Sequence, residues 1–406
     1  MGLQLGSENY KAGSYIVIEG KKNSRNFYII RQGHVQLSRE RSIVDDHSAS
    51  RLGPGDFFGV VSCMSQHPRI ETVMALSDVS LISILREQFG DLIQKNAPVA
   101  MKIIKQFSVK LRYYDQSIAR LSFQDEVFEH PMRLFDLGEF YFKKKNFQHA
   151  AYCYQKYIQH NSSGNNISAS KMRLQALNAP ETPIVDPQNA GMNRSYANDD
   201  MIFSEHEPGN ELYIIQQGKV KITKVINDNE IMLAVLQPGD IFGEMALLDN
   251  KPRSASAIAY GDVVMLTVNR SNFEQMVISK PQIATRLIQL LSERIWIAHK
   301  QLSNIMMRDP LGRIYDTLLT QVLKNRITIE HRKQYTFEFG AKELIKMVGL
   351  SIEKGEMLIR KLLENNKFRI VSEKLHVDDL EELEKQAQYF VKMEEMERKR
   401  EASSRK

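Results

Sequence analysis

Cysteine is scarce in this chain: Cys63 and Cys153 are the only two in 406 residues. Two cysteines cannot build a disulfide framework, and an iron–sulfur cluster needs about four ligands. We therefore exclude a disulfide-stabilised secreted scaffold and cluster-based redox sensing, and we expect a cytoplasmic protein.

Long apolar runs and catalytic signatures are also missing. No stretch of about 18 apolar residues occurs, so no membrane span is expected. The N-terminal residues 1–7 lack the basic and apolar regions of a signal peptide, and Gly6 breaks the myristoylation pattern. No nucleophile–base pair, metal-ligand spacing or Walker motif occurs, so we expect neither an enzyme nor a metal site.

The composition is that of an ordinary globular protein, with 42% hydrophobic and 26% charged residues. Its length allows two to four domains. The net charge of +6 is compatible with nucleic-acid binding, but spread over such a chain it favours that function only weakly.

The most informative stretch is residues 238–257, PGDIFGEMALLDNKPRSASA. Gly243 lets the backbone approach a ligand, and the following short helical turn presents free N–H groups that suit an anion. Arg253 offers a planar fork for two phosphate oxygens, and Ser254 adds a hydroxyl donor. Glu244 can accept from a ribose hydroxyl. A bare FGE would favour a turn with a surface Arg–Glu pair, but the complete run favours a ligand with both an anion and a hydroxyl.

This run resembles the cyclic-nucleotide-binding domains of bacterial catabolite-activator (Crp/Fnr) regulators and of protein-kinase-A regulatory subunits. The resemblance implies a β-roll or jelly roll that binds cAMP or cGMP as effector. Within it, Glu244 would hold the ribose. The cyclic phosphate would be held by Gly243, Glu244, Met245, Ala246, Arg253 and Ser254.

The N-terminal part of the chain repeats this pattern. Pro54, Gly59 and Arg69 each precede their counterparts in the second stretch by the same number of positions, which indicates a duplicated domain. The first copy has Val60 in place of the glutamate and Glu71 near the phosphate position. Ile70 replaces the serine. Arg69 is either a retained anion site or a structural arginine paired with Glu71, and we favour the second interpretation. We expect a non-binding, structural or dimerising copy, or one with an altered ligand.

A long helix is predicted after each barrel, at residues 87–124 and from about 270 to Asp309. The apolar stripe of the second helix, Leu287 to Ile305, suggests a parallel homodimer seam, and packing on the barrel is the alternative. The resemblance implies that Arg294 lies near the ligand. It also puts Ala298 and His299 where the family has adenine-contacting residues, so the choice between cAMP and cGMP stays open. His299 would contact the base or, alternatively, face solvent.

Between the two copies, residues 130–178 approach tetratricopeptide-repeat spacing. One repeat cannot form an extended groove, so a helical-hairpin spacer is favoured over a peptide-binding module. Residues 179–198 are predicted as a flexible linker.

Residues 311–377 follow the order helix, strand, helix, turn, helix, hairpin, which resembles the winged helix-turn-helix of the same family. The predicted second helix would enter the DNA major groove. Ile352 and Met357 stand where the family has guanine-reading arginines, so sequence-specific readout stays open. The residues predicted to contact DNA are Lys342, Ser351, Glu353, Lys354, Arg360, Lys361 and Lys374.

The sequence thus predicts an α+β multidomain protein with two cyclic-nucleotide-binding β-rolls, a TPR-like hairpin and a C-terminal winged helix. The predicted boundaries are 1–124, 125–195, 196–309, 310–390 and a charged, solvated tail at 391–406. We expect a homodimeric, cAMP-responsive, DNA-binding transcription regulator that uses its second barrel. The alternative is a nucleotide-sensing interaction or scaffold protein that has lost sequence-specific DNA binding.

Overall fold

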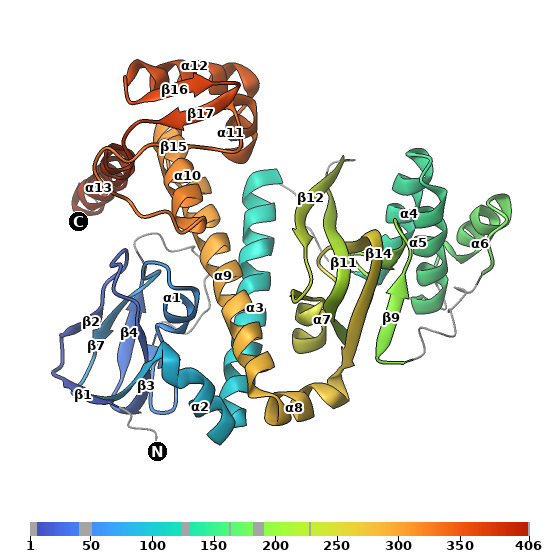
Figure 1. Ribbon diagram of the computed structural model, residues 1–406, viewed down its shortest axis with the longest axis horizontal. Coiled ribbons are helices and arrows are strands. Elements are labelled where there is room, and N and C mark those ends of the chain that lie inside the picture. The colour runs from blue at the N-terminus through green and yellow to red at the C-terminus, as the bar shows by residue number, and fades with distance from the viewer. Residues whose placement is uncertain are drawn as a thin grey trace. The chain divides into compact units, whose positions relative to one another are not determined.

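A computed structural model describes residues 6–39, 51–123, 130–161, 164–181, 191–226 and 229–404 (Figure 1). The chain divides into two compact units. The first unit comprises residues 1–89, 113–126 and 291–406, and the second comprises residues 90–112 and 127–290.

The first unit contains the N-terminal barrel. Its strands form two antiparallel four-stranded sheets, in the orders β1-β8-β3-β6 and β2-β7-β4-β5. Side chains alternate along β8, where Val79 and Leu81 are buried and Ser80 is not, as the two-residue period of a strand requires. The elements are β1 (Gly6–Tyr10), β2 (Tyr15–Val17), β3 (Asn26–Gln32), β4 (Val35–Ser38), β5 (Arg51–Leu52), β6 (Phe57–Phe58), α1 (Val60–Ser65), β7 (Thr72–Ala75) and β8 (Val79–Leu85).

The second unit contains the other barrel, an antiparallel sheet with the path β10-β14-β11-β12, to which β13 and β9 add at β11 and β14. Its elements are β9 (Asn193–Tyr196), β10 (Met201–Phe203), β11 (Glu211–Ile226), β12 (Asn229–Leu236), β13 (Ile241–Phe242), α7 (Glu244–Asp249) and β14 (Ser256–Asn269). The strand β13 corresponds to β6, and the helix α7 corresponds to α1, with the same difference in residue number for both pairs. This constant difference confirms the predicted duplication. The strand β9 lies where we predicted linker, and residues 182–190 of that linker lie outside the described residues.

The helices that follow the two barrels are each broken once. The predicted continuous helix at 87–124 is wrong: η1 (Arg86–Gln88) and α2 (Phe89–Lys95) are separated from α3 (Ala97–Phe123) at Asn96. Pro98 explains the break, because it has no N–H to continue the helical ladder and fits only in a first helical turn. In the second copy the break between α8 (Arg270–Ser279) and α9 (Pro281–Ile305) falls at Lys280, which is the position equivalent to Asn96.

The apolar stripe of α9 is largely buried within the chain itself. The buried members are Leu287, Leu291, Ile295, Ala298 and Leu302. The alternative of packing within one chain therefore applies to these positions, while the homodimer stays a prediction.

The helical insert between the barrels consists of η2 (Pro131–Arg133), α4 (Leu134–Lys143), α5 (Phe147–His160) and α6 (Ile167–Ala176). Its buried residues, including Leu137, Tyr141 and Tyr154, share one core with Met201 and Ile258 of the second barrel. The insert is thus packed onto that barrel and is not the separate spacer that we favoured from sequence.

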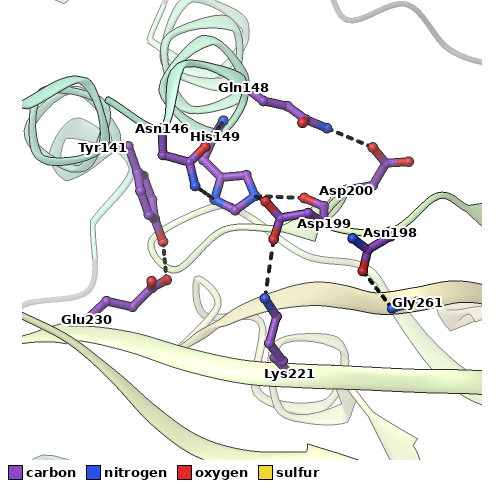
Figure 2. Close-up of polar contacts among 10 residues, drawn as sticks. All are labelled: Tyr141, Asn146, Gln148, His149, Asn198, Asp199, Asp200, Lys221, Glu230 and Gly261. Atoms are coloured by element: carbon purple, nitrogen blue, oxygen red, sulfur yellow. Dashed lines mark hydrogen bonds and ion pairs between the residues drawn. The ribbon is translucent and has the colours of Figure 1, made fainter. Parts of the chain in front are cut away.

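Polar contacts fasten the same interface (Figure 2). The side chain of Asn146 donates to Nδ1 of His149 at 2.8 Å, so the ring carries its proton on Nε2 and donates to the carbonyl of Asp199 at 2.8 Å. The hydroxyl of Tyr141 donates to Glu230 at 2.9 Å. A buried ring with both nitrogens bonded fixes the position of α5 on the barrel.

The C-terminal module follows α9 in the first unit. It consists of α10 (Pro310–Lys324), β15 (Tyr335–Thr336), α11 (Ala341–Met347), α12 (Ile352–Glu364), β16 (Phe368–Val371), β17 (Lys374–Val377) and α13 (Leu380–Ser404). The carboxylate of Asp309 caps α10 by accepting from the N–H groups of Leu311 and Gly312, and Pro310 takes the first helical position. The order of elements is the predicted one.

Two glycines shape the junction between α11 and α12. Gly349 has φ +67° in the turn, and a β-carbon at Gly355 would lie 2.5 Å from the side chain of Ile345. The helices can therefore approach closely. Most of the predicted solvated tail belongs to the helix α13. Glu401 of this helix forms an ion pair with Arg308 at 2.6 Å.

Candidate functional site

The central feature of the second barrel is the turn from β13 into α7, here called the second cassette (residues 241–254). Gly243 adopts φ +74°, and a β-carbon there would lie 2.8 Å from the guanidinium of Arg253. The short helix α7 begins directly after it and ends at Asn250, which also has a positive φ. The N–H groups of Glu244, Met245 and Ala246 thus stand at the start of a helix, where they favour an anion.

Arg253 is the cation of the second cassette, and it is only 4% exposed. Its Nη1 donates to the carbonyl of Gly243, and its guanidinium carbon lies 4.2 Å from the centre of the Phe203 ring. Its Nε is buried and has no hydrogen-bond partner among the residues that the structure describes. A buried guanidinium with unused donor capacity beside a helix N-terminus is suited to hold a phosphate.

Three residues that contact Arg253 were not predicted from the sequence. Gly209 leaves room for the guanidinium, because a β-carbon there would lie 2.3 Å from Nε. The rings of Phe203 and Tyr213 flank it, at 4.2 and 5.7 Å from their centres. Burial raises the pKa of the Tyr213 hydroxyl, so this ring stays neutral beside the arginine. No spacing rule links these positions to residue 253, so the sequence carried no signal for them.

The remaining predicted residues of the second cassette are gathered at the same place. Glu244 is 2% exposed, and Met245 and Ala246 are buried. Ser254 is half-buried, with its Oγ 4.0 Å from the sulfur of Met245, and its carbonyl accepts from Lys224 at 2.9 Å. The structure therefore brings the six residues of the phosphate and ribose prediction together.

The first barrel has an equivalent turn with different chemistry, here called the first cassette (residues 57–70). Gly59 has φ +78°, but Val60 and Ile70 are buried apolar residues. Arg69 donates from Nε, Nη1 and Nη2 to the carbonyls of Asn23, Gly59 and Asn26.

These contacts favour the structural interpretation of Arg69, which stays a prediction. Its donors are used on the backbone, as expected of a structural arginine, and the negative charge of Glu71 also attracts its guanidinium, in keeping with the predicted pairing. Glu71 forms a further ion pair with Arg39 at 3.7 Å. The guanidinium is held by carbonyl oxygens that need no charged partner.

Arg294 and His299 were predicted to lie near the nucleotide. Both belong to the part of α9 in the first unit, whereas the second cassette belongs to the second unit, so no one unit brings them together. Arg294 is exposed. His299 is buried rather than solvent-facing, with Nδ1 3.5 Å from the hydroxyl of Tyr114 and Nε2 3.9 Å from Glu19.

The residues predicted to contact DNA lie on the surface of the C-terminal module. Ser351 is the N-cap residue of α12, where its carbonyl accepts from Gly355. Six of the predicted residues are exposed: Lys342 on α11, Ser351 at the N-cap, and Glu353, Lys354, Arg360 and Lys361 on α12. Lys374 on β17 pairs with Glu338. Ile352 and Met357 are 73% and 60% exposed on α12.

Comparison with known proteins assigns the barrels. Residues 7–96 and 193–280 both match the family model of the cyclic nucleotide-binding domain. Both barrels are thus similar to cyclic nucleotide-binding domains. Each of them contains one of the two cassettes, so two versions of the same turn can be compared within one chain.

The chain is also similar to Crp/Fnr-like transcription regulators. It is 27% identical to the CRP-like cAMP-activated global transcriptional regulator of Mycobacterium tuberculosis, over 46% of this chain and 84% of the relative. It is 29% identical to the cyclic AMP receptor protein of Thermus thermophilus, over 44% and 79%. Among solved structures, the catabolite activator protein of Thermus thermophilus matches with 29% identity and a TM-score of 0.29, over 49% of this chain and 90% of that one.

These relatives are regulators and not enzymes, in line with the lack of a catalytic signature in the sequence. A search of the described helices finds none that is both long and apolar enough to cross a membrane.

Proposed function

We propose that this protein is a cyclic-nucleotide-responsive transcription regulator in which the second barrel binds the ligand, most simply cAMP. The observation that carries the proposal is the difference between the cassettes. The second one has a buried Glu244 beside a buried Arg253 whose Nε is unpaired, and the first has Val60 and a fully bonded Arg69. The curated relatives named above are cAMP-activated or cAMP-receptor proteins, which supports cAMP over other cyclic nucleotides.

In the proposed binding mode, the N–H groups at Gly243–Ala246 and the hydroxyl of Ser254 hold the cyclic phosphate together with Arg253. The carboxylate of Glu244 accepts from the ribose hydroxyl. The negative phosphate is stabilised by the helix terminus and by a guanidinium that is already desolvated, so little further dehydration is needed on binding. The base-contacting roles of Arg294 and His299 stay predictions from the sequence.

For the output, we propose that the C-terminal module acts as a winged helix-turn-helix with α12 in the DNA major groove. Ser351, Glu353 and Lys354 at the exposed start of α12 would face base edges and nearby phosphates. Lys342, Arg360, Lys361 and Lys374 would contact the DNA backbone.

One observation favours a second candidate function, a nucleotide-sensing interaction protein. Ile352 and Met357 are highly exposed on α12, and apolar side chains at these positions cannot make the hydrogen bonds that read guanine. Such residues suit a protein surface at least as well as a DNA groove.

Nucleotide binding is tested by calorimetry of the full chain with cAMP and cGMP. Glu244→Ala and Arg253→Lys should each weaken binding by tenfold or more, since each removes contacts worth about 1.5–3 kcal/mol. The matched substitution Arg69→Lys in the first cassette should leave the affinity unchanged. Equal loss with Arg69→Lys would assign the site to the first barrel instead.

DNA binding is tested by selecting random duplexes with the purified chain, with and without cAMP. Enrichment of a sequence only with cAMP supports the regulator. For that sequence, Lys354→Ala should weaken binding and reduce its salt dependence. Failure to enrich any duplex while cAMP still binds would favour the interaction protein.

A further inference from the structure

Each compact unit combines one barrel with part of the helix that follows the other barrel. The first barrel shares its unit with residues 291–305 of α9, which follows the second barrel in sequence. The second barrel shares its unit with residues 97–112 of α3, which follows the first barrel. The duplicated domains have therefore exchanged helical segments within a single chain.

In the second unit, Arg112 of α3 attaches to the second cassette. It donates from Nε and Nη2 to the two carboxylate oxygens of Asp249, and from Nη1 to the carbonyl of Pro252 at 3.1 Å. Both charged side chains are buried, at 2% and 3% exposure. Asp249 is the last residue of α7, so Arg112 holds the end of the helix opposite to Gly243.

In the first unit, the same position of the other helix makes the corresponding contact. The constant offset between the two copies makes Trp296 the equivalent of Arg112, and Pro68 the equivalent of Pro252. The indole Nε1 of Trp296 donates to the carbonyl of Pro68 at 3.2 Å. Its ring stacks on His67, and His67 in turn contacts Glu293 at 2.7 Å.

In both contacts the equivalent helix position donates to the carbonyl of the equivalent proline. The remaining interactions differ: Arg112 forms a buried ion pair at the second cassette, whereas Trp296 forms an aromatic stack at the first. A bidentate guanidinium–carboxylate pair holds its partners in one orientation, and breaking it leaves a buried charge uncompensated. The orienting ion pair between Arg112 and Asp249 thus occurs at the second cassette, which is the one that contains Glu244.

We propose that Arg112 is the positioning residue that couples nucleotide occupancy of the second barrel to α3. This inference rests on the proposed function, in that the second barrel must bind a cyclic nucleotide. A phosphate at the start of α7 and Arg112 at its end act on the same six-residue helix, so a displacement of α7 moves Asp249 and Pro252 together. The remainder of α3, from Tyr113, belongs to the unit that contains Trp296 and the C-terminal module.

The test compares wild type, Arg112→Gln and Arg112→Lys for cAMP affinity and for the fluorescence of Trp296, the only tryptophan in the chain. Wild type should bind cAMP and change its emission on binding. Arg112→Gln should bind at least about fivefold more weakly, a typical size for coupling between sites, and lose the emission change. Arg112→Lys keeps the charge without the fork and should recover part of both.

The matched control is Arg286→Gln, which removes an exposed arginine 3.9 Å from Asp240 in the same unit and should behave as wild type. Should Arg112→Gln fail to fold, Asp249→Asn gives the same comparison with a smaller change.

A wild type that does not bind cAMP overturns the proposed function. A wild type that binds, with Arg112→Gln and Asp249→Asn matching its affinity and emission change, overturns the coupling. Light scattering at the assay concentration completes the test: coupling that vanishes in the monomer would show that the helices are exchanged between chains.

Discussion

Trp296 stacks on His67 with ring centres 4.0 Å apart and planes at 22°. The indole is 1% exposed, and it donates to the carbonyl of Pro68. A helix that follows the second barrel is thereby fixed to the first cassette. The contact can be followed optically in the native chain without any label.

His67→Ala should expose one face of Trp296. We expect a red-shifted emission, increased quenching by acrylamide and a loss of about 0.5–1.5 kcal/mol of stability, the usual range for an aromatic pair. His34→Ala, a partly exposed histidine of the same barrel, is the control and should change neither spectrum nor quenching. Unchanged quenching in His67→Ala would contradict the stacked arrangement.

Arg69→Ala should destabilise the first barrel without affecting the nucleotide. It removes hydrogen bonds to three backbone carbonyls and leaves these acceptors buried, which predicts a loss of about 2–4 kcal/mol. Chemical denaturation measures the loss. The cAMP-induced rise in Tm of the second barrel should persist, and its disappearance would mean that Arg69 takes part in binding.

His206 should make the protein sensitive to acid. Burial, together with the positive charges of Arg133, Lys224 and His130, lowers the pKa of His206 to about 3. The carboxylate of Glu205, 3.9 Å away, does not offset this. Because the unfolded chain takes up the proton near pH 6.5 and the folded chain does not, stability is lost as pH falls below about 6.5, by up to about 1.4 kcal/mol per pH unit.

His206→Asn tests this, since asparagine tolerates the φ of +70° at this position. Unfolding free energies measured from pH 4.5 to 7.5 should fall less steeply in the variant. At the upper end of this range the difference between the two proteins should become constant, because the imidazole is then neutral in both the folded and the unfolded chain. Parallel curves over the whole range would rule out His206 as the titrating group.

His149→Phe should loosen the helical insert from the second barrel. The substitution keeps a ring but removes the bonds to Asn146 and to the carbonyl of Asp199 seen in Figure 2. We expect a loss of about 1–3 kcal/mol and faster proteolysis within residues 130–181. Gln148→Ala, which removes an exposed contact to Asp200, should have little effect. Equal proteolysis of both variants would argue against this role of His149.

The cassettes were predictable because local chemistry determines them. Gly243 and Gly59 require a positive φ, and the spacing from glycine to arginine is set by one short helix and one turn. The partners of the long helices were not predictable in the same way. A buried apolar stripe such as that of α9 shows that a helix is covered but not what covers it, because the hydrophobic effect has no direction. The contact of Arg112 with Asp249 joins residues 137 positions apart, and no sequence period connects them.

In the proposed function, Glu244 is the ribose-binding carboxylate, and Val60 at the equivalent position of the first cassette leaves each chain with one such group. A receptor assembled from two identical chains has two equal inputs, and their interaction can steepen its dose–response curve. A single chain with one competent and one silent copy would have one input, and its occupancy would follow a simple hyperbola. The predicted homodimer would have two such inputs, one from each chain, so a dose–response curve steeper than a hyperbola would indicate that the two chains interact.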